Sequence, residues 1–166
     1  MKLQTYRADL SDLAPICSEI IIAAEKGHFC LNPLQSNIEQ WSHRNIFSVI
    51  EYGHFENGLS AIPIVFEFKN QPIGYVIMSE VAPGSGGNEI HIFIVPRAYQ
   101  NQGYGTHMLT NIMKERKTVD VYARCAPASE QMFYMLQKRG FKYIEDNEEG
   151  FRILLRSKDK KKPRYK

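Results

Sequence analysis

The residues best suited to chemistry lie between Glu89 and Gly105, where an apolar run leads into a short turn that contains two glycines. Gly103 and Gly105 lack Cβ atoms, so a ligand can approach the backbone closely at this turn. The apolar spacing that follows Gly105 indicates a helix, and the N–H groups at a helix N-terminus bind phosphate groups. We therefore expect this junction of strand and helix to hold an anionic cofactor.

Two titratable side chains, Glu89 and His91, precede the turn on the same expected strand. Because side chains alternate along a strand, both are expected on the face that also holds Phe93 and Val95. A carboxylate or an imidazole in that position can accept a proton from an attacking nucleophile. Glu80, at the end of the preceding strand, is a third candidate. The alternatives are a solvent-facing position for Glu89 and a structural hydrogen bond for His91.

Hydrophobic periodicity predicts the elements that position these groups. Strands are expected at residues 3–7, 62–68, 73–80, 90–95, 119–125, 141–144 and 151–156, and helices at 13–24, 36–50, 103–117 and 129–139. The strands 62–68 and 73–80 are expected to form a hairpin through Asn70-Gln71-Pro72. The order β-α-α-β-β-β-α-β-α-β-β predicts an α/β (α+β) domain whose central mixed sheet carries helices on both faces.

Length and composition favour one domain. The chain has 166 residues, 43% of them hydrophobic, which suffices for a single core, expected over residues 1–157. No segment reads as a signal peptide or membrane span, which favours a cytoplasmic protein. The three cysteines, Cys17, Cys30 and Cys125, lack CxxC spacing, so we expect buried or half-buried thiols and no metal site.

The C-terminal residues 158–166 differ from the rest of the chain in charge. They contain six basic residues and one acidic residue, whereas the chain as a whole has a net charge of +3. The remainder is therefore slightly acidic. We expect a disordered, solvated tail, with a nucleic-acid or partner contact as the alternative.

The order of elements and the glycine turn resemble the GCN5-related N-acetyltransferase (GNAT) family, whose members transfer an acetyl group from acetyl-coenzyme A to an amine. Residues 100–105, QNQGYG, are similar to the family's pyrophosphate signature, in which Arg or Gln is followed by two residues, Gly, one residue, and Gly or Ala. The segment FEFKNQPIGYVIM resembles the family's second and third strands, and KRGFKYIE its closing Gly-Phe segment. The resemblance covers residues 60–156 and extends to the first 60 residues only in outline.

The resemblance implies that acetyl-coenzyme A binds at the strand end and the turn. The backbone amides of the turn would hold the pyrophosphate, and the strand end would pair with the pantetheine arm where the strand from Val119 splays away. The N–H group of Phe93 would polarise the thioester carbonyl. The implied binding residues are Phe93, Ile94, Val95, Gln100, Asn101, Gln102, Gly103, Tyr104, Gly105 and Thr106. Glu89 lies eleven residues before Gln100, as does the base of the histone acetyltransferase branch.

The sequence departs from the family pattern in the last helix. Many members have a tyrosine four residues before the Gly-Phe pair, where it protonates the departing thiolate, and here that position is Leu136. Tyr134 is near in sequence but lies about 200° around the helix from Leu136. The segment His28-Phe29 lies where the first two helices of the family wall the acceptor site; a helix-ending Gly27 followed by a packed phenylalanine is the alternative.

We therefore expect a GNAT-type acetyltransferase that uses acetyl-coenzyme A by direct transfer in a ternary complex, without a metal. The acceptor is expected to be the amine of a small molecule, peptide or protein, and the protein to be a monomer or homodimer without a membrane partner. A non-catalytic acyl-coenzyme A sensor or interaction module is the alternative, which Leu136 favours. A nucleic-acid-associated protein that uses its basic tail is a third, less favoured interpretation.

Overall fold

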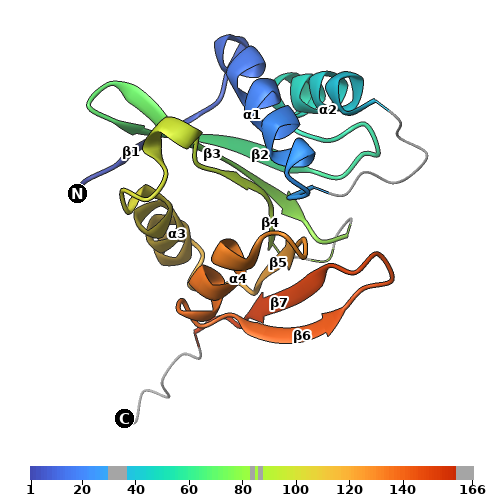
Figure 1. Cartoon of the computed structure of the whole chain (residues 1–166), viewed down its shortest axis with the longest axis vertical. Helices are drawn as coiled ribbons and strands as arrows, with labels where there is room; N and C mark the ends of the chain where they lie inside the picture. Colours follow the sequence, from blue (N-terminus) through green and yellow to red (C-terminus); the bar gives the residue numbers. More distant parts are fainter. Residues whose placement is uncertain (30–36, 83–84, 86–87, 160–166) are drawn as a thin grey trace, which may run out of the picture.

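The computed structural model describes residues 1–29, 37–82, 85 and 88–159. In this part of the chain, seven strands form one sheet in the order β1-β2-β3-β4-β5-β7-β6, with helices on both faces (Figure 1). The strands are β1 (Gln4–Arg7), β2 (Ala61–Phe68), β3 (Gln71–Glu80), β4 (Asn88–Ile94), β5 (Val121–Cys125), β6 (Lys142–Asp146) and β7 (Arg152–Arg156), and the helices are α1 (Leu13–Glu25), α2 (Ile38–Tyr52), α3 (Tyr104–Glu115) and α4 (Glu130–Gln137). The predicted order of elements and the mixed sheet are confirmed.

The sheet opens between its two central strands. Every neighbouring pair is antiparallel except β4 and β5, which are parallel. Their pairing joins only residues 88–90 to residues 121–123, and beyond Ile90 β4 pairs with β3 alone. The predicted divergence of β5 from β4 is therefore present.

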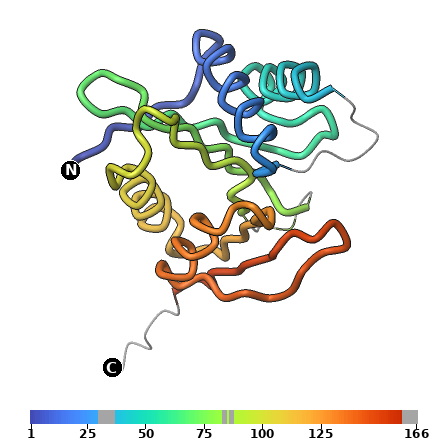
Figure 2. Tube along the Cα trace, viewed as in Figure 1, coloured from blue at the N-terminus to red at the C-terminus, as the bar shows by residue number. Residues whose placement is uncertain are grey.

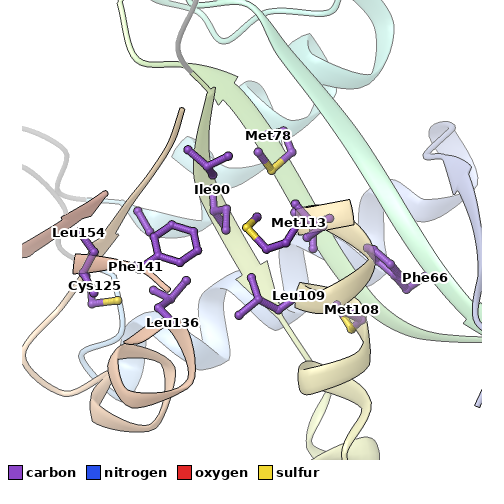
Figure 3. Packing of buried hydrophobic residues seen from close by; sticks show 14 of the residues in the cluster. Phe66, Met78, Ile90, Met108, Leu109, Met113, Cys125, Leu136, Phe141 and Leu154 are labelled. Carbon is purple, nitrogen blue, oxygen red and sulfur yellow. The ribbon is translucent and has the colours of Figure 1, made fainter. Parts of the chain in front are cut away.

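Each face of the sheet has its own apolar core. On one face, α1 and α2 bury Ile16, Ile20, Ile46 and Val49 against the N-terminal strands. On the other, Met108, Leu109 and Met113 of α3 and Leu136 of α4 lie between residues of β2 to β4, such as Met78 and Ile90, and residues of β5 and β7, such as Cys125 and Leu154 (Figure 3). These side chains join the two halves of the sheet where β4 and β5 no longer pair.

The hairpin between β2 and β3 turns earlier than predicted. Its turn residues are Lys69 and Asn70, whose φ angles of 52° and 61° suit a two-residue turn with both residues left-handed. Gln71 and Pro72 already belong to β3, and Pro72 pairs with Glu67 next to a register shift, a place where a strand tolerates proline. The prediction placed the turn too late because the sequence has no Asn-Gly or Asp-Gly pair here.

The N-terminus lies beside the β1 edge of the sheet (Figure 2), and the last described residues, 157–159, follow β7. The backbone N–H of Lys158 donates to Asp120 Oδ1 at 2.8 Å, and that of Asp159 donates to the carbonyl of Lys117 at 2.8 Å. The first two residues of the expected tail are thus attached to the turn before β5. Residues 160–166 lie outside the described residues, as do Cys30 and Ser36, the expected start of α2.

Candidate active site

A cavity of about 410 Å³ extends from the glycine turn before α3 to the opening between β4 and β5. This volume is in the range of small-ligand sites. Of the predicted binding residues, all but Gln102 line it, and His91 lines it as well. Glu89 and Glu80 do not. The remaining walls come from β5, from α4 and the residues just before it, and from the end of α1 and the segment after it.

The glycine turn has the features of an anion site. Gly103 is the N-cap residue of α3, with a φ of 83° that favours glycine, and a Cβ atom there would meet nothing within 4 Å. No side chain caps this helix, whereas the Asn37 side chain caps α2. The first N–H groups of α3 therefore border open space without a side-chain partner, which fits a bound pyrophosphate.

Gly105 also lines the cavity, but its surroundings differ from those of Gly103. A Cβ atom on Gly105 would lie 3.5 Å from Val95 Cγ2 and 3.7 Å from Phe93 Cε1, which is ordinary van der Waals contact. A small side chain would therefore fit there, against the strand end.

Two glutamine side chains fix the shape of the turn. Gln100 Nε2 donates to the carbonyl of Val95 at 2.8 Å, and Gln102 Nε2 donates to the carbonyl of Ala98 at 2.8 Å. Both amide groups are thus bonded to the turn's own backbone. What these residues would offer a ligand is their backbone, not their side chains.

A β-bulge in β4 changes the predicted arrangement of the catalytic candidates. The register of β4 against β3 shifts at His91, which is the extra residue of the bulge. Phe93 and Val95 pack against the core beneath α3 and α4, whereas the ring of His91 lies 4.5 Å from that of Phe55, in the core beneath α1 and α2. The expectation that Glu89, His91, Phe93 and Val95 share one face is therefore wrong, because the bulge interrupts the alternation.

Glu89 and His91 do lie together on the face covered by α1 and α2. Glu89 pairs with Ser79 of β3, and a hydrogen bond of 3.3 Å joins Ser79 Oγ to His91 Nδ1. Burial, together with the positive charge of Arg124, lowers the pKa of His91 to about 4. His91 is therefore a neutral imidazole at neutral pH, in the wall of the cavity.

Glu89, which is buried, forms an ion pair with the half-buried Arg124 of β5. Arg124 Nε donates to Glu89 Oε1 at 2.6 Å, and the exposed fraction of the side chain is 6% for Glu89 and 43% for Arg124. Burial raises the pKa of the Glu89 carboxyl, and the charge and hydrogen bond of Arg124 oppose that rise. The carboxylate thus lies behind the guanidinium, which itself lines the cavity.

Arg124 is a site residue that the sequence analysis missed. Val121, Ala123 and Cys125 of the same strand belong to the core beneath α3 and α4, so alternation places Arg124 on the opposite face, with Glu89. The sequence feature that could have pointed to it is a single arginine within the otherwise uncharged strand VYARC.

The segment after α1 and the helix α4 close the cavity from opposite sides. His28 and Phe29 line it, and His28 Nδ1 and Ser129 Oγ form a hydrogen bond of 2.9 Å that joins this segment to the start of α4. Met132, Met135 and Leu136 of α4 also line it. Tyr134 does not: its side chain points off the buried stripe and is 57% exposed.

No cluster of three or more His, Cys, Asp or Glu side chains suited to a metal ion occurs within residues 1–29, 37–82, 85 and 88–159. None of the helices in the same ranges is both long and apolar enough to span a membrane. Cys17 and Cys125 are buried free thiols.

The lowered pKa of His91 predicts a loss of stability in acid. In the unfolded chain the imidazole has its ordinary value of 6.5, and in the folded protein about 4, so between these values only the unfolded chain binds the proton. The free energy of unfolding therefore falls as the pH drops through this range, by about 3 kcal/mol once the pH is below both values.

Urea unfolding from pH 7.5 to pH 4 should show a smaller fall in this free energy for His91→Gln than for wild type. The exposed His43 serves as control: His43→Gln should follow wild type. A constant difference between wild type and His91→Gln at every pH would refute the prediction.

Comparison with known proteins agrees with this geometry. The model of the acetyltransferase (GNAT) family matches residues 30–141. No curated protein matches the sequence. One similar solved structure is PaiA N-acetyltransferase from Thermoplasma acidophilum in complex with coenzyme A, with 16% identity, a TM-score of 0.65 and coverage of 95% of this chain and 99% of that chain. A second is spermidine N-acetyltransferase from Vibrio cholerae in complex with coenzyme A and spermine, with 13% identity, a TM-score of 0.67 and coverage of 92% of each chain. A third is ribosomal-protein-S18-alanine N-acetyltransferase from Escherichia coli, with 12% identity, a TM-score of 0.64 and coverage of 99% of each chain. These identities are low, so the solved structures establish the fold, and the family model, which spans more than half of the chain, establishes the family: the chain belongs to the GNAT acetyltransferases.

Proposed function

We propose that the protein transfers an acetyl group from acetyl-coenzyme A to an amine by direct attack within a ternary complex. The observation that carries this proposal is the continuity of the cavity, which connects the glycine turn with His91 and Arg124 on the other side of the sheet opening. Direct transfer requires the donor and the acceptor to be bound at once, with their reacting atoms in contact. One cavity that borders both regions meets that requirement.

The donor, acetyl-coenzyme A, supplies the acetyl thioester. The backbone N–H groups of Gln102, Gly103, Gly105 and Thr106 would hold its pyrophosphate at the start of α3. The strand end 93–95, which has no β5 partner, can extend the sheet by pairing with the two amides of the pantetheine arm. The N–H group of Phe93 is the proposed donor to the thioester carbonyl.

On the acceptor side, we assign proton removal to Glu89. An alkyl ammonium group has a pKa of roughly 10 and must lose a proton before its nitrogen can attack. Burial raises the pKa of Glu89, which makes it a better proton acceptor than an ordinary carboxylate, whereas His91, with a pKa of about 4, is a poor one. Because Glu89 does not line the cavity, the proton would travel through a water molecule, and the neutral His91 would orient that water or the amine.

Tyr134 should have no part in the reaction. Its side chain is 57% exposed and does not line the cavity, so its hydroxyl is not placed to protonate a leaving thiolate. We expect Tyr134→Phe to keep turnover within about threefold of wild type, since loss of a general acid lowers the rate by at least about 10². Steady-state measurement of thiol release tests this. A loss of the larger size, with coenzyme A binding intact, would make Tyr134 the thiolate acid.

The proposed function is tested by a panel of small amines, amino acids, amino-acid amides and peptides incubated with acetyl-coenzyme A. Free thiol is followed with a chromogenic disulfide, and acetylated product is identified by mass. Acetylation of at least one amine above the protein-free rate is expected. Tight coenzyme A binding by calorimetry, without acetylation of any acceptor, would favour the sensor alternative, which Leu136 in place of a family tyrosine also favours.

A further inference from the structure

We propose that the acceptor carries a carboxylate close to its amine, as an amino acid does, and that Arg124 binds this carboxylate. The inference rests on the proposed acetyl transfer and names its acceptor class. Arg124 lies on β5 just beyond the last residue that pairs with β4, where the sheet opens. It also shares its face of the sheet with Glu89 and His91, away from the glycine turn of α3.

The charge of the cavity wall favours an anionic group. Among the described residues that line the cavity, Arg124 is the sole arginine or lysine, and none is an aspartate or glutamate. His91 is neutral, since burial and Arg124 hold its pKa at about 4. A polyamine or a lysine-rich peptide would meet the guanidinium of Arg124 first, because the paired carboxylate of Glu89 is buried behind it and does not line the wall. A carboxylate would meet its complement.

The ion pair with Glu89 prepares Arg124 for such a ligand. A guanidinium group has five N–H donors in a planar fork, and the bond to Glu89 uses the one on Nε. In the part of the chain that the structure describes, neither terminal nitrogen of Arg124 has a protein hydrogen-bond partner, and the side chain is 43% exposed. The Glu89 carboxylate is buried behind it. A ligand in the cavity thus encounters the positive end of the pair, whose two terminal nitrogens can bind a carboxylate in bidentate fashion.

Neighbouring groups suit the rest of an amino acid. His91 supplies a neutral polar group next to Arg124, close to which the amine would lie. Ala23 and Phe29 supply apolar surface from the α1 side of the cavity, which suits an apolar substituent. Arg124 is therefore assigned to substrate binding, and Glu89 has two roles, as proton acceptor and as the group that positions Arg124.

The first test compares matched acceptors on the wild-type protein: each L-amino acid, its carboxamide and the amine that lacks the carboxyl group, all with acetyl-coenzyme A. We expect the best amino acid to exceed its own amide in kcat/KM by at least about 10-fold, the effect of one charge-assisted hydrogen bond. If amides or plain amines are acetylated as well as or better than amino acids, this inference fails while the proposed function stands. If none of these acceptors is acetylated, this inference fails as well, and the wider panel that includes peptides decides whether the proposed function stands.

The second test uses variants at position 124. Arg124→Gln should raise KM for the best amino acid by about 10- to 100-fold and leave the KM of its amide and the coenzyme A affinity within about threefold. Arg124→Lys keeps a cation beside Glu89, so the buried carboxylate stays paired and the variant should fold. Lysine lacks the planar pair of N–H donors, so a KM between those of wild type and Arg124→Gln is expected. Arg139→Gln is the matched control, because Arg139 bonds Thr110 and does not line the cavity. Equal losses for acid and amide would show a structural role only and overturn the inference.

Discussion

Replacing Glu89 by glutamine is expected to lower the turnover number by about 10² to 10⁴, the range for loss of a general base. Glutamine keeps an oxygen that can accept the hydrogen bond from Arg124 Nε, now 2.6 Å in length, so the position of Arg124 and the KM of the acceptor should change little. The affinity for coenzyme A should stay within about threefold. Stopped-flow or steady-state thiol release, with calorimetry for binding, separates these effects.

The pH dependence gives Glu89 a second signature. The base must be ionised to accept a proton, and burial raises its pKa, so wild-type kcat should rise with pH through a range above that of ordinary carboxyl groups. Glu89→Gln should lack this limb. Glu80→Gln is the comparison and should behave as wild type, since Glu80 lies at the end of β3 opposite Asn88, whereas Glu89 is bonded to Arg124 in the cavity wall. A rate for Glu89→Gln equal to that of wild type at every pH from 6 to 9 would contradict the assignment and transfer the role to His91, Glu80 or solvent.

Gly103→Asp is expected to weaken coenzyme A binding by at least about 100-fold. The side chain has room, because a Cβ atom at Gly103 meets nothing within 4 Å, but its carboxylate would occupy the open space at the start of α3 and repel the phosphates. The φ of 83° strains a residue other than glycine by about 1–2 kcal/mol, which the fold should tolerate. Calorimetric titration with coenzyme A measures the loss.

Two further variants isolate the cause of that loss. Gly103→Asn has nearly the same shape without the charge and should bind coenzyme A more tightly than Gly103→Asp. Gly140→Asp makes the same change at a glycine with φ of 86° and equal free space, away from the cavity, and should bind as wild type does. Affinity of a folded Gly103→Asp within a few-fold of wild type would remove the pyrophosphate assignment.

Most of the fold could be predicted from local patterns in the sequence. The spacing of Ile16 and Ile20 in α1 and of Leu109 and Ile112 in α3 predicted the buried helix faces, and both pairs are in the cores. The turn at Gly103 could be predicted because its chemistry is local: a glycine conformation at a helix start.

The catalytic side of the site was harder to predict because it depends on pairing between strands. The bulge at His91 arises from the register of β4 against β3, which no property of the segment EIHIF reveals. The ion pair of Glu89 and Arg124 joins residues 35 positions apart, and it forms because β5 pairs in parallel with the first residues of β4. Such contacts follow from topology, which residue types alone do not specify.

The opening between β4 and β5 gives the protein an edge in the middle of its own sheet. At an ordinary sheet margin, unpaired backbone groups invite other chains to add a strand and so promote aggregation. Here the residues after Ile90 are enclosed by α4 and by the segment after α1, within the walls of the cavity. The unpaired backbone groups can therefore pair with a ligand that enters the cavity, while α4 and the segment after α1 cover an edge that could otherwise add a strand from another chain.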